Sequence, residues 1–183
     1  MLKQPKNTKR LFIGFRFNEL FDAPFNEILN RLKVRGFANI TKRQNLHITL
    51  AFLGNIDLNE VEVVIEKLKV FPFKDYHPKF EFKELKVKTN NKKVMLWATF
   101  SPNGSAIKLH EAIHQYLNIK PDHKFVPHIT FCRARKDQTV LSKNQFQDIK
   151  LIDYTLEKTT LYESNNTKKG VHYTPLLSIV NLA

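Results

Sequence analysis

The chain has 183 residues, of which 42% are hydrophobic and 15 are Phe, so it can bury a sizeable core as one compact domain. Lys and Arg number 30 against 17 Asp and Glu, and the formal charge of +13 favours polyanionic partners, nucleic acid foremost. No apolar stretch approaches the roughly 20 residues that cross a bilayer, so we expect a cytoplasmic protein without a membrane partner.

The N-terminal part of the chain predicts a leader, a strand and a helix. Residues 1–10, rich in Lys and Asn, are expected to form a loose basic leader. The apolar run over residues 11–17 is typical of a buried strand. Asp22 is expected to cap a helix that has Pro24 in its first turn and ends before Gly36.

A second strand and a second helix follow. The apolar residues 46–53 predict a strand, which Gly54 closes. Asp57 is expected to cap a helix that reaches about residue 70, and Pro72 prevents its continuation. The apolar face of this helix is expected to consist of Leu58, Val61, Ile65 and Leu68.

The middle of the chain predicts two strands and a third helix. Residues 79–88 alternate apolar and charged side chains, and a slip in that alternation between Phe82 and Leu85 indicates a β-bulge. Residues 94–100 predict the partner strand. A third helix is expected over residues 102–117.

The remaining strands complete an α+β pattern. Strands are predicted over residues 127–133, 151–162 and 173–180, with 164–170 as a polar connection. The order of strands and helices repeats loosely in the two halves, and no linker divides them. We therefore expect residues 1–183 to form a single domain with mainly antiparallel sheets.

Two tetrapeptides of the same form carry the chemistry. They are His47-Ile-Thr-Leu and His128-Ile-Thr-Phe, each within a predicted strand. Side chains at positions i and i+2 of a strand share a face, so each His points the same way as its Thr. An imidazole moves protons near neutral pH, and a hydroxyl can bind an anion. If both motifs face one cleft, a phosphodiester would meet a general acid, a general base and two hydroxyls.

The predicted third helix carries a competing motif. His110-Glu111-Ala-Ile-His114 matches H-E-x-x-H, in which two His one turn apart bind zinc and Glu activates water. A zinc hydrolase also needs a third ligand, and the next His, His123, lies in a probable loop. The alternative is that His110 and His114 flank the core face of the helix.

The one cysteine, Cys132, excludes an intramolecular disulfide and a multi-cysteine zinc site. It lies two residues beyond Thr130 and would share the face of His128 if the strand continues regularly. A thiol nucleophile and a small buried core thiol are the two readings of this residue.

The paired motifs resemble those of the 2H phosphoesterases. Residues 46–54 and 127–133 are similar to the branch of bacterial RNA 2',3'-cyclic phosphodiesterases, also called 2'-5' RNA ligases, and residues 11–15 resemble its opening strand. The resemblance implies a bilobal α+β fold with two mainly antiparallel sheets, flanking helices and a pseudo-twofold central cleft. It also implies a monomeric enzyme that needs no metal or other cofactor. Its substrate would be RNA or an oligonucleotide that ends in a 2',3'-cyclic phosphate.

The resemblance also implies a role for each motif residue. His47 would be the general acid that protonates the departing 3' oxygen, and His128 the general base that activates water. Hydrolysis would leave a 2'-phosphate, and the same site could run the reverse 2'-5' ligation. Thr49 and Thr130 would bind the non-bridging phosphate oxygens.

Two further substrate-binding residues, Arg133 and Phe52, lie five positions beyond His128 and His47. The resemblance implies that Arg133 contacts the phosphate and that Phe52 stacks on a base. An offset of five is odd, so strict alternation would put both on the face opposite their His. Core packing is the alternative for Phe52. A non-catalytic RNA-binding module that grips phosphate with the same two motifs is the main alternative function.

Overall fold

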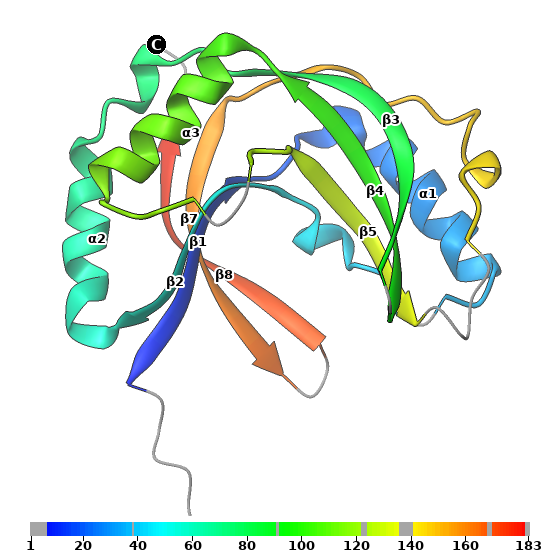
Figure 1. Cartoon of the computed structure of the whole chain (residues 1–183), viewed down its shortest axis with the longest axis horizontal. Helices are drawn as coiled ribbons and strands as arrows, with labels where there is room; N and C mark the ends of the chain where they lie inside the picture. The colour runs from blue at the N-terminus through cyan, green and yellow to red at the C-terminus, as the bar shows by residue number, and fades with distance from the viewer. Residues whose placement is uncertain are drawn as a thin grey trace, which may run out of the picture.

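The computed structural model describes residues 7–37, 39–90, 92–121, 124–135, 141–167 and 170–181. These residues contain eight strands and three α-helices, an α+β arrangement (Figure 1). The strands are β1 (Thr8–Phe15), β2 (Ile48–Asp57), β3 (Lys79–Thr89), β4 (Lys93–Pro102), β5 (His128–Arg135), β6 (Tyr154–Thr155), β7 (Lys158–Thr167) and β8 (Gly170–Val180). The helices are α1 (Asp22–Val34), α2 (Leu58–Val70) and α3 (Gly104–Tyr116).

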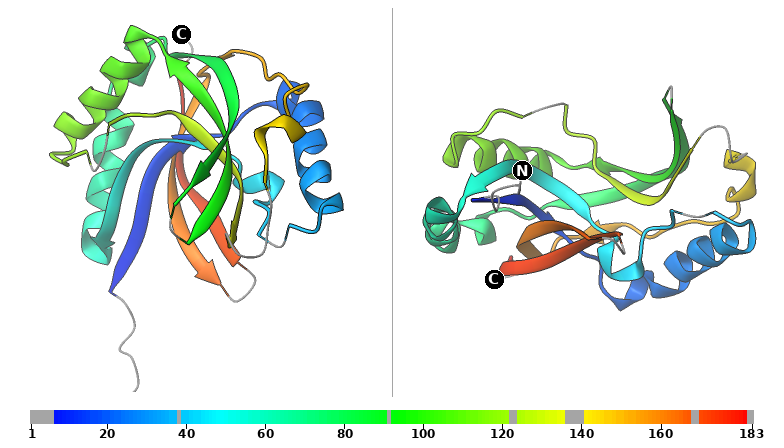
Figure 2. Two further views of the ribbon diagram at one scale, coloured as in Figure 1. Left: turned by 45° about the vertical axis from the view of Figure 1, so that its right-hand side comes forward. Right: turned by 90° about the horizontal axis from the view of Figure 1, so that it is seen from below.

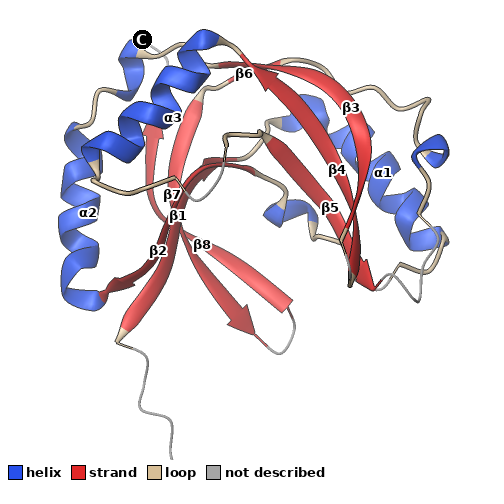
Figure 3. Cartoon of the chain, viewed as in Figure 1, coloured by secondary structure: helices blue, strands red, loops and turns tan. Residues whose placement is uncertain are grey.

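The strands form two four-stranded antiparallel sheets, with the orders β2-β1-β7-β8 and β5-β4-β3-β6 (Figure 3). Each sheet has one motif strand at its edge, β2 in the first and β5 in the second. These two edge strands contact each other. The expected fold class, two mainly antiparallel sheets with flanking helices, is confirmed.

The helices flank the sheets at two ends of the molecule, α2 and α3 at one and α1 at the other (Figure 2). They also connect the two halves of the chain. Helix α1 comes from the first half but packs on β5, whereas α3 comes from the second half and contacts β2. One continuous apolar core therefore runs through both sheets.

Helix α1 shows how the apolar pattern specifies packing. Phe25, Ile28 and Leu32 recur at helical spacing and are fully buried. Asp22 was expected to be the N-cap, but a 3₁₀ turn leads directly into the helix and Asp22 is its first residue. The Asp22 carboxylate instead accepts a hydrogen bond from Arg43.

A loop segment of the first half covers the outer edge of β5. Ile40 forms an isolated bridge with Cys132. On either side of the bridge, the Thr41 N–H donates to the Phe131 carbonyl at 2.8 Å, and the Arg133 N–H donates to the Asn39 carbonyl at 3.0 Å. Strand β5 is thus held between β4 and this segment.

Several predicted boundaries are wrong. Strand β1 begins at Thr8, because residues 8–10 of the expected leader pair with β2; residues 1–6 lie outside the described part. The expected connection at 164–170 is instead largely hairpin, since Ser164 pairs with Tyr173 and the strands continue to their turn. The strand expected over 151–162 is divided between β6 and β7.

Two further details of the predicted elements are resolved by the structure. The bulge expected in β3 is confirmed, because the β3–β4 register shifts between Phe82 and Glu84. Leu58 is 47% exposed and does not belong to the buried face of α2, which centres on Val61 and Leu68. No helix in the described ranges is long and apolar enough to cross a membrane.

Candidate active site between the two motif strands

The first motif contains a β-bulge at its fourth residue. Thr49 pairs with Gly14 of β1 and Ala51 pairs with the preceding residue, Ile13, so Leu50 is the extra residue. Gly14 is required here because a Cβ at this position would lie 2.5 Å from the Ile48 carbonyl oxygen. The missing side chain lets β1 approach the motif backbone closely.

The second motif contains a bulge at the same position. Thr130 pairs with Trp97 of β4 and Cys132 pairs with Leu96, so Phe131 is the extra residue. The bulge reverses the alternation beyond it. Cys132 is therefore fully buried instead of sharing the face of Thr130, and burial raises the pKa of its thiol. The predicted shared face is wrong, and the structure supports the core-thiol reading.

The same reversal explains the odd offset of five in both halves. Arg133 is exposed, and its Nη2 donates to Thr130 Oγ1 at 3.4 Å, so it lies on the motif side of β5. Phe52 is 52% exposed and lines the same cleft as Thr49. The bulges thus bring both residues back to the face of their motif, and core packing does not describe Phe52.

The two motif histidines are oriented in the same way. His47 Nδ1 lies 2.7 Å from the Asn45 carbonyl oxygen, and His128 Nδ1 lies 2.8 Å from the Val126 carbonyl oxygen. In each case the acceptor is two residues before the His. A carbonyl can only accept, so each Nδ1 bears the hydrogen of the neutral ring. Each Nε2 is then the nitrogen with a free lone pair.

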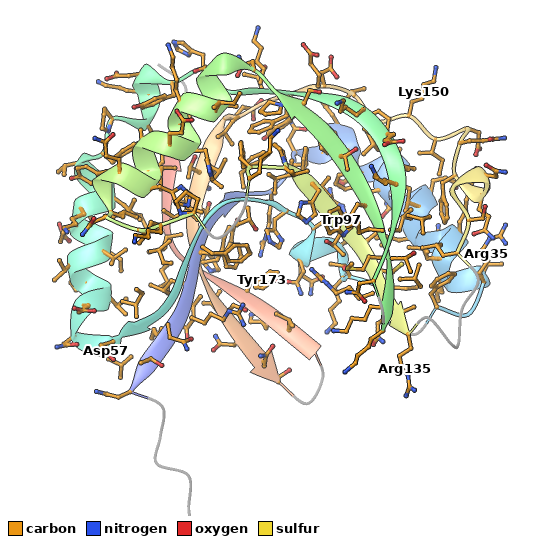
Figure 4. The ribbon with its side chains drawn as sticks, in the orientation of Figure 1. Arg35, Asp57, Trp97, Arg135, Lys150 and Tyr173 are labelled. Carbon is orange, nitrogen blue, oxygen red and sulfur yellow. The ribbon has the colours of Figure 1, made fainter. Side chains whose placement is uncertain are left out.

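Aromatic side chains surround the motif histidines. The rings of His47, Phe12 and Tyr173 form a cluster, in which the His47 centroid lies 4.9 Å from each of the other two. His128 stacks on Trp97 at a centroid distance of 3.8 Å and an interplanar angle of 22°. Figure 4 shows Trp97 and Tyr173, which belong to different sheets. Neither was identified as a site residue from the sequence, although Trp97 is the one Trp in the chain.

Burial and positive charge disfavour protonation of both imidazoles. Burial lowers the pKa of His47 to about 4, against the opposing effect of the Asn45 hydrogen bond. The charges of Arg133, Arg16 and His128 lower it further. Burial, assisted by Arg133, also lowers the pKa of His128. Both rings are therefore mainly neutral at pH 7 in the free protein.

Arg16, which the sequence analysis also missed, affects His47 through its charge and lines a separate pocket. Its guanidinium carbon lies 5.0 Å from the centroid of the Tyr162 ring, and its Nη2 donates to the Tyr173 carbonyl at 3.4 Å. Its positive charge contributes to lowering the pKa of His47. No local motif marks Arg16, because its place beside His47 depends on the pairing of β1 with β7 and of β7 with β8.

A cleft of about 920 Å³ is lined by residues of both motifs, but His47, Thr130 and Arg133 are not among its lining residues. Its lining includes Thr49 and Phe52 from β2 and His128 from β5, while His47 is close enough to His128 and Arg133 for their charges to affect it. Among the residues that the structure describes, the cleft lining contains no Asp or Glu. Its cationic residues are Arg10, Lys86, Lys88, Lys120 and Lys124.

The competing His pair on α3 lies in the wall of the same cleft. His110 and His114 are both buried, whereas Glu111 is exposed. His110 Nδ1 donates to the Leu50 carbonyl and His114 Nδ1 to the His110 carbonyl, each at 2.7 Å. The described residues include no group of three or more His, Cys, Asp or Glu that could hold a metal ion. His123, the predicted third candidate, lies outside them.

Comparison with known proteins shows what this chain is similar to. The family model of LigT-like phosphoesterases matches residues 19–96, which contain the first motif. The RNA 2',3'-cyclic phosphodiesterase of Thermotoga maritima is 29% identical over 174 residues, which cover 90% of this chain and 91% of that protein. The protein of the same name from Aquifex aeolicus is 25% identical over 175 residues, 90% of this chain and 93% of its own. The chain is therefore similar to LigT-like phosphoesterases and to proteins named RNA 2',3'-cyclic phosphodiesterase.

Solved structures share the family fold over nearly the whole chain. E. coli LigT complexed with ATP has a TM-score of 0.71 at 19% identity, covering 96% of this chain and 99% of that one. The apo form of E. coli LigT has a TM-score of 0.69 at 20% identity, with coverage of 96% and 98%. The second motif, outside the range of the family model, therefore lies within the shared fold.

Proposed function

We propose that this protein hydrolyses RNA 2',3'-cyclic phosphate ends to 2'-phosphates, without a metal, by acid–base catalysis from His47 and His128. The observation that carries the proposal is the matched orientation of the two imidazoles. Each donates its Nδ1–H to the carbonyl two residues earlier, which leaves Nε2 for proton transfer. The names of the relatives from T. maritima and A. aeolicus support the same activity.

The proposed reaction uses the two histidines on opposite sides of the phosphorus. His128 takes a proton from water as the water oxygen forms a bond to phosphorus. The bond from phosphorus to the 3' oxygen breaks, and that oxygen takes a proton from His47. The same sequence of steps, with a 5'-hydroxyl in place of water, would form a 2'-5' phosphodiester and release the 3' oxygen as a hydroxyl, which is the 2'-5' ligation. The cyclic ester is strained, so positioned proton transfer can suffice.

The acid must be protonated when the substrate is bound. In the free protein, burial and three neighbouring cationic or titratable groups hold the pKa of His47 near 4. A bound phosphodiester anion stabilises an imidazolium and raises its pKa. We therefore assign proton uptake by His47 to the substrate complex rather than to the free protein.

The remaining motif residues would bind the phosphate and the terminal nucleotide. Thr49 and Thr130 supply hydroxyls on the same strand faces as their histidines, and Arg133 already donates to Thr130. These donors would stabilise the charge that grows on the non-bridging oxygens. Phe52 is half exposed at the cleft and offers a ring on which a base can stack.

The charge of the cleft supports RNA as the substrate. Its described lining has cationic side chains from β1, β3 and the loop that precedes β5, and no carboxylate. Such a surface attracts the phosphate backbone and makes binding depend on salt. Because both motifs come from one chain, we propose that a monomer is sufficient.

The test is incubation of the protein, in EDTA, with an oligonucleotide that ends in a 2',3'-cyclic phosphate, followed by identification of the product isomer. We expect a 2'-phosphate, and a loss of about 10²–10⁴-fold in rate for His47→Ala and for His128→Ala. Full activity of both variants would overturn the mechanism. Binding without turnover would identify a non-catalytic RNA-binding module, and activity that EDTA abolishes would favour the zinc hydrolase.

A further inference from the structure

One buried imidazole outside the two motifs contacts both sides of the cleft. His110 Nδ1 donates to the carbonyl of Leu50, the bulge residue of the first motif strand, at 2.7 Å. The ring of His110 also stacks on Phe125, with centroids 4.2 Å apart and planes at 8°. Phe125 precedes Val126, whose carbonyl accepts the hydrogen bond that orients His128. A single side chain of α3 thus connects the bulge of β2 with the loop that positions His128.

The bulge in β5 is held in a comparable way by a different kind of donor. There the carbonyl of the bulge residue, Phe131, accepts from the backbone N–H of Thr41. In each half, therefore, the carbonyl of the fourth motif residue accepts a hydrogen bond from a donor outside its own sheet. In the second motif the donor is a backbone N–H, which a side-chain substitution leaves in place. The first motif uses the side chain of His110.

We propose that His110 is a positioning residue. It fixes strand β2, which bears Thr49 and Phe52, relative to strand β5, which bears His128. This inference rests on the proposed function. It gives the first His of the H-E-x-x-H motif a role in which no metal takes part. A displacement of reacting groups by about 1 Å can reduce the rate about 10²-fold, so the effect falls on the chemical step.

His114 is the matched control for His110. It lies one helical turn further on α3, is equally buried and lines the same cleft. Its Nδ1, however, donates to the His110 carbonyl within α3 itself. Substituting His114 therefore disturbs the helix and the cleft wall to a similar extent without removing the hydrogen bond to β2.

The experiment compares His110→Phe, His110→Asn and His114→Phe by steady-state kinetics on the cyclic-phosphate oligonucleotide. His110→Phe keeps an aromatic ring against Phe125 but removes the donor, and we expect kcat to fall about 10- to 100-fold with KM nearly unchanged. His110→Asn keeps an N–H donor near the position of Nδ1, so it should recover most of kcat. His114→Phe leaves the donor to the Leu50 carbonyl in place, so it should lower kcat less than His110→Phe does.

A readout that does not need turnover separates the two proposals. The Cε1–H resonances of His47 and His128 are followed by NMR during titration with inorganic phosphate. Both resonances should shift further from their wild-type positions in His110→Phe than in His114→Phe, although the His114 ring lies 4.2 Å from the His110 ring. A folded His110→Phe variant with wild-type resonances and wild-type kcat would overturn the positioning role. An inactive wild-type protein whose resonances still respond to His110→Phe would overturn only the proposed function.

Discussion

Leu50 and Phe131 occupy the same position in the two halves of the molecule: each is the fourth residue of its motif and the extra residue of a β-bulge. A strand without the bulge would direct the residue five places beyond each His away from the cleft. With the bulge, Phe52 and Arg133 return to the face of their motif. The two bulges therefore determine that Phe52 and Arg133 lie on the same strand face as the Thr of their motif.

The two motif hydroxyls give a direct prediction for phosphate binding. Thr49→Val and Thr130→Val preserve side-chain shape while removing the donor to a non-bridging oxygen. A hydrogen bond to a charged group contributes about 1.5–3 kcal/mol, so each variant should lose about 10- to 100-fold in kcat/KM. Steady-state kinetics checks this. Thr99→Val, at another hydroxyl of the cleft lining that donates to the Glu84 carbonyl, is the control and should lose much less.

The lowered pKa values predict an acidic optimum for kcat/KM. This parameter follows the ionisation of the free enzyme, in which His47 has a pKa of about 4 and His128 lies below its ordinary value of 6.5. One proton shared by the pair gives a bell-shaped profile with its maximum between about pH 4 and 6.5. The maximum of kcat should lie at higher pH, because bound phosphate raises the pKa of an imidazolium. A flat profile from pH 4 to 8 contradicts the mechanism.

The same lowered pKa of His47 predicts how stability depends on pH. The unfolded chain binds a proton at this residue near pH 6.5, whereas the folded protein does so only near pH 4. The unfolded state therefore binds more protons in this window, and the free energy of unfolding falls as the pH decreases from 6.5 to 4. Urea unfolding across this range measures the slope. His47→Gln removes the titration and should make the slope shallower.

Gly14 predicts a link between packing and activity. An added Cβ would lie 2.5 Å from the Ile48 carbonyl oxygen, which is backbone between His47 and Thr49. Gly14→Ala should lower the free energy of unfolding by about 1–3 kcal/mol and reduce kcat in the fraction that remains folded. Gly104→Ala is the matched control, since a Cβ there has no atom within 4 Å. Equal behaviour of the two variants in urea unfolding and kinetics would refute the close-approach explanation.

The cationic lining of the cleft predicts that KM depends on the length of the RNA substrate. Lys88→Glu places a negative charge in the cleft, whereas Lys67→Glu makes the same change on the surface of α2, outside the lining. Lys88→Glu should raise KM for an oligonucleotide more than for a cyclic mononucleotide, and increasing salt should reduce the difference. Comparable KM changes for both substrates would mean that the cleft does not follow the RNA backbone.

The sequence predicted the elements whose side chains alternate clearly. Residues 79–88 revealed their bulge because charged residues mark the slip between Phe82 and Leu85. The run over residues 46–53 hid its two register shifts, since most of its residues beyond Thr49 are apolar and give no alternation to interrupt. The extension of the β7–β8 hairpin was missed because polar residues on an exposed ribbon resemble a loop.

For the site, too, the sequence predicted the residues that have a local signal and missed those that depend on tertiary contacts. The motif residues were found because their residue types carry chemistry at a fixed local spacing. Trp97, Tyr173 and Arg16 were missed because their contacts with the motif histidines join strands distant in sequence. The connection of His110 to Leu50 also depends on tertiary packing, so the sequence offered a zinc motif where the structure shows a hydrogen bond between two elements.

The covering of β5 by residues 39–41 and by α1 constrains how the protein can be made. Both covering segments belong to the first half of the chain. They are therefore synthesised before β5 and cannot pack on it until residues 128–135 have left the ribosome. An isolated second half would present β5 as an open edge, a template for association with other chains. Neither half thus contains both β5 and the segments that cover it, and the two motifs are both present only after residues 128–135 have been synthesised.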